Sequence, residues 1–249
     1  MDARRRARER RAEADDPHAE AQLLVDRVRA GEVERNQVLL LAYAGHPGLA
    51  AQLIEELAEW TAFNEVDAAL DPLLGEPATA TSLASWLLGL ALFEPASAVR
   101  AMATAFPLVA ARVRALEADP EVQHPYYAEE FEYEVESAGQ ALNAALIAFM
   151  NWTATGATPL LCAELRRSAG QTSWYGDAVP RGFSGLFEAP ADCAEWTPLA
   201  LEAGENRRRR RLQLEGWTSL LEAAGVDLPQ ALAAAQGAVQ AHVRGALGL

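Results

Sequence analysis

The spacing of apolar residues is the feature that most restricts how this chain can fold. Between its Gly and Pro residues, apolar side chains recur three and four positions apart, as in Ala21, Leu24 and Val28, which places them on one face of an α-helix. No segment shows the sustained alternation of apolar and polar residues that strands need, and the helix-favouring residues Ala and Leu dominate while Ile is almost absent. We therefore predict an all-α fold.

The same spacing locates the helices. They are expected over residues 18–30, 38–44, 49–60, 66–73, 82–93, 95–106, 108–118, 126–150, 158–169, 207–224 and 229–247. The segment 82–93 is apolar nearly all round and should lie at the centre of the fold, and Asp227 should cap the last helix. Because the segments follow no strict period, we expect irregular antiparallel helix pairs, arranged as an α-solenoid-like stack or a multi-helix bundle.

Two stretches depart from this pattern. Residues 1–16 are charged and lack an apolar face, so we interpret them as an extension before a single helical domain of residues 17–249. Within that domain, residues 170–196 hold four Gly, two Pro and five aromatic residues and form one long irregular loop. It is either a lid over a pocket, with Trp174, Tyr175, Asp177 and Arg181 as members, or a packed loop that completes the core.

Charge is distributed unevenly along the chain. The net charge is −14, every base is Arg, and residues 12–206 carry 9 Arg against 30 Asp and Glu. Basic clusters occur only at residues 1–11, with 6 Arg, and at Arg207–Arg211. Phosphate would be repelled over most of such a surface, which argues against general nucleic-acid binding. We expect Arg207–Arg211 to form the exposed first turn of a helix.

The sequence lacks the motifs of the common cofactor and metal sites. Two cysteines, Cys162 and Cys193, are too few for a disulfide scaffold and form no C-x-x-C pair. No P-loop, G-x-G-x-x-G or G-x-S-x-G pattern occurs. One His follows a Glu by three positions, His124 after Glu121, whereas a di-iron bundle requires such a pair on each of two helices. We therefore expect no cofactor and no metal, and interpret His46 as a cap on the last carbonyls of a helix.

Nothing in the chain predicts a membrane or secretory protein. The charged N-terminus is followed by no apolar segment of the secretory type. The longest apolar run, Leu83–Phe93, is too short to cross a bilayer. A cytoplasmic location is the resulting expectation.

One segment resembles a known group of sequences. Residues 21–50 are similar to an N-terminal helical segment of uncharacterised bacterial proteins, in which a Leu- and Arg-containing helix, an Arg-x-Gly turn and an Ala-Tyr-x-Gly-His helix end follow one another. The corresponding residues here are Arg29, Gly31, Ala42, Tyr43, Gly45 and His46. The resemblance implies a helix–turn–helix opening and a bacterial origin, and it carries no function to transfer.

The most unusual local composition is acidic. No Arg occurs between residues 115 and 165, whereas nine Asp and Glu do. On a helix, Glu129, Glu132 and Glu136 share one face, and Glu130 and Glu134 share another. Such a surface is a docking face for a basic partner, a hard-cation site, or a solvated face that only keeps the protein soluble.

These observations lead to two hypotheses of different classes. The first is a non-enzymatic helical protein that binds another, basic protein, of the adaptor or toxin-neutralising type, through the acidic face formed by Glu129, Glu130, Glu132 and Glu136. The alternative is an all-α enzyme or small-ligand binder with its site beneath the loop 170–196.

Overall fold

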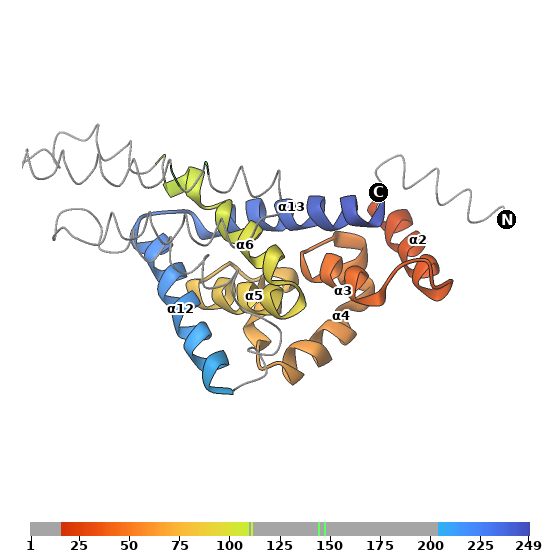
Figure 1. The fold of residues 1–249 in the computed structure, drawn as a ribbon, viewed down its shortest axis with the longest axis horizontal. Helices are drawn as coiled ribbons and strands as arrows, with labels where there is room; N and C mark the ends of the chain where they lie inside the picture. Colours follow the sequence, from red (N-terminus) through yellow and green to blue (C-terminus); the bar gives the residue numbers. More distant parts are fainter. Residues whose placement is uncertain (1–15, 110, 112–143, 145–146, 148–203) are drawn as a thin grey trace, which may run out of the picture.

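A computed structural model describes residues 16–109, 111, 144, 147 and 204–249 of the chain, and these residues form helices and no strands. The all-α prediction is thus confirmed for the described part. Its elements, shown in Figure 1, are α2 (Pro17–Arg29), α3 (Arg35–Tyr43), α4 (Pro47–Phe63), the 3₁₀-helix η1 (Asp67–Leu74), α5 (Ala80–Phe93), α6 (Pro95–Ala103), α12 (Gly204–Ala223) and α13 (Leu228–Leu247).

Short-range signals explain where the first helices begin and end. The Asp16 side chain caps α2 by accepting hydrogen bonds from the backbone N–H groups of His18 and Ala19, at 3.1 and 3.3 Å. The chain leaves α2 through Gly31, whose φ of 70° suits a residue without a Cβ atom. Helices α2, α3 and α4 agree with the segments predicted near residues 18–30, 38–44 and 49–60.

The prediction for residues 66–73 is wrong in helix type. This segment forms the 3₁₀-helix η1 rather than an α-helix. Pro72 lies inside it and lacks the N–H group that an α-helical hydrogen bond at that position requires. The element ends at Gly75, which has a left-handed backbone conformation with φ 90°.

Helix α5 is the central element, as predicted for residues 82–93. It begins with a capping box in which the Thr79 hydroxyl accepts from Ser82 N–H and the Ser82 hydroxyl accepts from Thr79 N–H, at 3.1 and 2.9 Å. Every residue from Ser82 to Ala91 is buried. Helices η1, α6 and α12 all pack against it. An all-round apolar sequence therefore corresponds to a helix covered on all sides.

Helix α3 is joined to α5 by a reciprocal pair of hydrogen bonds. The Tyr43 hydroxyl donates to the Trp86 carbonyl at 3.1 Å, and the Trp86 indole N–H donates to the Tyr43 carbonyl at 3.0 Å. Both side chains are fully buried, and burial raises the pKa of Tyr43 well above its ordinary value. The close approach depends on Gly89, because a Cβ atom there would lie 2.0 Å from the Tyr43 hydroxyl oxygen.

Helix α13 closes the described structure. In Figure 1 it runs along one side of the molecule, past α6, α5 and α3, and ends beside α2. The Arg27 guanidinium of α2 donates to the Leu247 carbonyl at 3.1 Å, and Gln240 donates to the Ala44 carbonyl at 2.9 Å. Asp227 occupies the predicted cap position, but its side chain makes no capping hydrogen bond.

Several predictions fall on other parts of the chain. The extension at residues 1–15, the helix expected at 158–169 and the loop 170–196 lie outside the described residues, as do most of the helix expected at 108–118 and all but Ala144 and Ile147 of the helix expected at 126–150. Across the part that the structure describes, no helix combines the length and the apolar character that crossing a bilayer demands.

Candidate partner-binding surface

A groove of about 410 Å³ lies between α4, η1 and α13. Its lining includes Pro47, Ala51 and Ile54 of α4, Leu73 and Leu74 of η1, and Gln236 of α13. Leu74 is 64% exposed at its edge. The groove, defined by these six residues, is open to solvent, and polar atoms form almost half of its lining.

Helix α13 forms one wall because the turn between α3 and α4 has no side chain at Gly45. This residue has φ 89°, and a Cβ atom on it would lie 2.9 Å from the Gln236 amide nitrogen. Gln236 therefore packs directly on the turn, one helical turn before Gln240, which bonds to the Ala44 carbonyl. The side chains of Gln236 and Gln240 thus hold α13 against the turn between α3 and α4, about 190 positions earlier in the sequence.

A row of exposed residues lies on α4 after a kink at Leu53. Glu55, Glu59 and Phe63 follow one another at intervals of four residues and all are exposed. Residues four apart on a helix are neighbours. We call these three residues the α4 row. Phe63, at its far end, is 86% exposed, and Ala51 of the groove lies on the other side of the kink.

The sequence segment that contains the α4 row is acidic, although Arg35 and Arg211 reach it from outside. Residues 36–99 contain eight Asp and Glu and no Arg. Glu56 is held by Arg35, whose Nε and Nη2 atoms lie 2.8 and 2.6 Å from its two carboxylate oxygens. The hydrogen bond to Glu56 and the negative charge of Glu56 raise the pKa of Arg35. Glu55, Glu59 and Glu76 remain exposed carboxylates of this segment.

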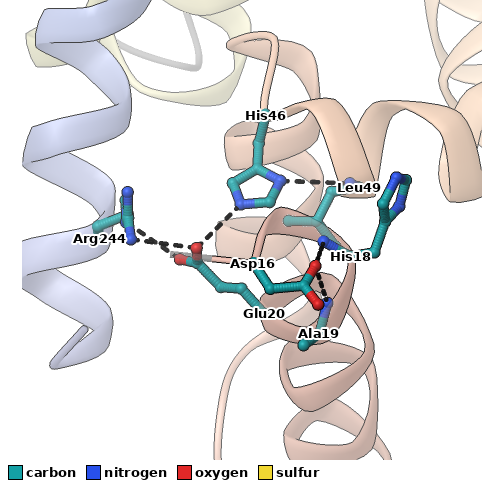
Figure 2. Close-up of polar contacts among 7 residues, drawn as sticks. All are labelled: Asp16, His18, Ala19, Glu20, His46, Leu49 and Arg244. Carbon is teal, nitrogen blue, oxygen red and sulfur yellow. Dashed lines mark hydrogen bonds and ion pairs between the residues drawn. The ribbon is translucent and has the colours of Figure 1, made fainter. Parts of the chain in front are cut away.

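A polar cluster of Glu20, His46 and Arg244 joins α2, the start of α4 and α13. The Glu20 carboxylate of α2 lies between His46 and Arg244 of α13, as Figure 2 shows. Its Oε2 atom is 3.3 Å from His46 Nε2 and 3.1 Å from Arg244 Nη2, and its Oε1 atom is 3.0 Å from Arg244 Nε. The Glu20 and His46 side chains are only 5% and 3% exposed.

The tautomer of His46 follows from its other nitrogen. Nδ1 accepts the backbone N–H of Leu49 at 3.3 Å, so the hydrogen of the neutral ring is on Nε2, facing Glu20. His46 therefore caps the beginning of α4, not the end of α3 as predicted. The turn at Gly45 directs the ring toward the free N–H groups of the next helix. Because it is buried, this cluster serves to hold α2, α4 and α13 together and gives a substrate no access.

A third cluster lies at the corner between α5 and α6. The Glu94 carboxylate accepts a short hydrogen bond from the Ser97 hydroxyl, and the same oxygen lies 3.5 Å from His242 Nε2 of α13. Burial lowers the pKa of His242, nearby Arg100 lowers it further, and Glu94 opposes both. Burial also lowers the pKa of Arg100. Ser97 donates to the carboxylate, not to the imidazole, so the arrangement is not that of an activated serine nucleophile.

The Arg run on α12 is only partly as predicted. Helix α12 begins at Gly204, so the Arg residues extend beyond its first turn. Arg208 and Arg209 are exposed, but Arg210 is buried. The Arg211 guanidinium donates a short hydrogen bond to the Glu65 carbonyl, just after α4. The prediction that Arg207–Arg211 form a fully exposed turn is therefore wrong. Successive residues of a helix point in different directions, and Arg210 faces the core.

The site residues predicted from sequence are not part of this surface. The acidic residues Glu129, Glu130, Glu132 and Glu136 and the loop residues Trp174, Tyr175, Asp177 and Arg181 all lie outside the described residues. Within the described ranges, no group of three or more His, Cys, Asp or Glu side chains is placed to hold a metal ion.

Comparison with protein-family models, curated proteins and solved structures finds no match to this chain.

The sequence contained a signal for the α4 row that spacing alone could have identified. Glu55 and Glu59 lie four residues apart on the predicted helix 49–60, and Phe63 follows four residues further. The groove had no comparable signal, because its walls come from residues near 50, 73 and 236.

Proposed function

We propose that this chain is a non-enzymatic helical protein that binds a basic partner protein. The observation that supports it best is the acidic character of residues 36–99, which carry eight Asp and Glu and no Arg, with Glu55, Glu59 and Glu76 exposed. A surface of one charge sign speeds association with a surface of the opposite sign. The acidic residues of segment 115–165 add a second region with the same preference.

The polar clusters of the described helices are consistent with this proposal. Glu20 is buried and paired with the buried His46 and with Arg244, and Ser97 donates a hydrogen bond to the Glu94 carboxylate. Each of these groups already has a structural partner, whereas the exposed carboxylates of the α4 row face solvent.

The experiment begins by identifying the partner through cross-linking and mass spectrometry in the native host. Its association and dissociation rates are then measured with the purified chain at two salt concentrations. We expect the triple reversal Glu129→Lys, Glu132→Lys and Glu136→Lys, or the double reversal Glu55→Lys and Glu59→Lys, to slow association about tenfold at low salt. Dissociation should change much less.

The control is Glu222→Lys, which reverses an exposed carboxylate on α12 that belongs to neither acidic segment of the sequence. It should leave the association rate within about twofold of wild type, because one exposed charge contributes little when salt screens it. A partner whose association rate is indifferent to salt and to both sets of reversals would contradict the proposal.

A further inference from the structure

We infer that His46 makes the junction between α2 and α4 sensitive to acid. When the imidazole takes up a second proton, the helix cap that it forms is lost and the start of α4 opens locally. This inference concerns a conformational change within the chain and is independent of the partner proposed above. It follows from the way in which the two ring nitrogens of His46 are used.

Only the neutral imidazole satisfies both contacts of the ring. Figure 2 shows the ring between Leu49 and Glu20: Nδ1 accepts the Leu49 backbone N–H at 3.3 Å, and Nε2 lies 3.3 Å from the Glu20 carboxylate. An imidazolium carries hydrogen on both nitrogens and accepts no hydrogen bond. After protonation, Nδ1–H would therefore point at Leu49 N–H, and a donor on a fully buried residue would lose its acceptor.

The first turn of α4 has no second acceptor of its own. It contains no acidic residue, and the two residues that follow His46 are Pro47 and Gly48, whose side chains accept no hydrogen bond. Carboxylates are the groups that commonly stabilise a helix at this end. The cap of α4 therefore depends on the protonation state of one imidazole.

The charges around the ring allow it to be protonated in place. Glu20 of α2 attracts an imidazolium and Arg244 of α13 repels one, and these two groups are themselves paired at 3.0 Å. Other charged and titratable side chains of the surrounding helices contact solvent or other partners, among them Asp16, His18, Arg35, Glu56 and His242. Because Glu20 remains beside Nε2 in both states, the second proton changes the contact at Nδ1.

Opening of this cap reaches α2 because the two helices approach each other closely at their first turns. A Cβ atom on Gly48 would lie 2.3 Å from the Pro17 carbonyl oxygen and 3.0 Å from the Ala21 Cβ atom. Contacts this tight leave little room for one helix start to shift without the other. We therefore expect the amides at the start of α2 to respond together with those at the start of α4.

The first measurement is NMR of the full chain with ¹⁵N-labelled His, in which the spectrum of His46→Asn assigns the His46 signals by their loss. At pH 7.5 we expect the hydrogen of the ring on Nε2 and none on Nδ1. At pH 5.0, below the range in which an ordinary imidazole titrates, both nitrogens should carry hydrogen. A hydrogen on Nδ1 at pH 7.5, or a neutral ring at pH 5.0, would overturn the inference.

The second measurement is hydrogen exchange of the Leu49 amide, expressed as its protection relative to that of Leu87 in the central helix α5. Acidification from pH 7.5 to pH 5.0 should lower this relative protection at least about fivefold, the order of effect of losing a helix cap. In His46→Asn it should change less than about twofold, because Asn caps a helix but does not titrate. The matched control His18→Asn, which removes an exposed His of α2, should behave as wild type.

The outcomes decide the inference even if His46→Asn does not fold. In wild type, the pH midpoint of the change in Leu49 protection should coincide with that of the His46 ring nitrogens. A midpoint that instead follows His18 or His242 would assign the change to another group and overturn the inference. An equal fall in wild type and His46→Asn would overturn it too, as would unchanged Leu49 protection at a pH where the His46 ring carries both hydrogens.

Discussion

Two contacts between helices far apart in the sequence are made by different chemistry. The contact between α3 and α5 is formed by Tyr43, Trp86 and Gly89, with aromatic rings, two hydrogen bonds to backbone carbonyls and no charge. The contact between α2 and α13 is formed by Glu20 and Arg244, with His46 as a third member.

The comparison shows what each kind of contact depends on. The Tyr43 ring stacks on Trp86 at a centroid distance of 6.3 Å, and the neighbouring rings of Trp60 and Phe93 stack at 4.0 Å. Such packing depends on shape, so added volume should damage it most. The Glu20 cluster depends on compensation of a buried charge, so removal of a partner should damage it most. Three changes test this difference, and a fourth extends it to the charged cluster of Glu94 and His242, from the largest expected effect to the smallest.

The substitution Gly89→Ala should have the largest effect. Its Cβ atom would lie 2.0 Å from the Tyr43 hydroxyl oxygen and 2.5 Å from the ring carbon that bears it. Because the ring is held by buried neighbours, we expect the free energy of unfolding to fall by more than about 3 kcal/mol, as measured by urea denaturation.

Its matched control is Gly237→Ala in α13, where nothing lies within 4 Å of the added Cβ atom. That change should raise stability by about 0.5–1 kcal/mol, because Ala is the better helix former. Equal effects of the two substitutions would contradict the close approach of α3 and α5.

The substitution Arg244→Met should come next. It leaves the Glu20 carboxylate buried with only His46 beside it, and we expect a loss of about 2–3 kcal/mol in the free energy of unfolding. Glu20→Gln should cost less, about 1 kcal/mol. In that variant an amide oxygen still faces His46, and Arg244, whose side chain is 38% exposed, can be hydrated.

Arg209→Met is the control for Arg244→Met, because Arg209 is an exposed Arg on α12. Its effect should stay within about 0.5 kcal/mol. If Glu20→Gln proves more damaging than Arg244→Met, the interpretation of Glu20 as the buried charge that needs compensation is wrong.

The substitution Tyr43→Phe should have a moderate effect. It removes the hydroxyl that donates to the Trp86 carbonyl but keeps the ring, so we expect a loss of about 1 kcal/mol at pH 7. Burial raises the pKa of Tyr43 in the folded state, so wild type should lose stability as pH rises above about 10, where the unfolded chain ionises. The difference between the two proteins should therefore shrink in alkaline urea titrations; a constant difference would contradict the buried hydroxyl.

The smallest effect should be the pH dependence due to His242. Burial and Arg100 lower its pKa in the folded state, so the unfolded chain binds this proton more readily than the native protein. The contribution of neutral His242 is complete above about pH 6.5 and declines as pH falls below that value.

The measurement compares urea midpoints of wild type and His242→Gln at pH 7.5 and pH 5.5. The stability of wild type relative to the variant should be lower at the acidic pH, since Gln does not titrate. A relative stability that increases on acidification would mean that Glu94 outweighs burial, and would contradict the prediction.

Local patterns were enough to predict most of the helices. The apolar spacing predicted α2 to α6 and the two C-terminal helices, and the all-apolar sequence of α5 predicted its central position. These features depend on residues only a few positions apart, where spacing, caps and Gly or Pro act directly. The type of η1 was missed because a single Pro72 changed its hydrogen-bonding pattern.

Tertiary structure decided which polar and apolar groups meet. His46 caps α4 and faces Glu20, 26 positions earlier in the sequence, while Arg244 reaches the same carboxylate from 224 positions away. Arg210 is buried within a run of identical residues because only one side of α12 faces the core. The groove likewise exists only where α4, η1 and Gln236 of α13 come together. Helix periodicity specifies which face of each helix is buried, but the partner of that face is selected by packing among all the helices at once.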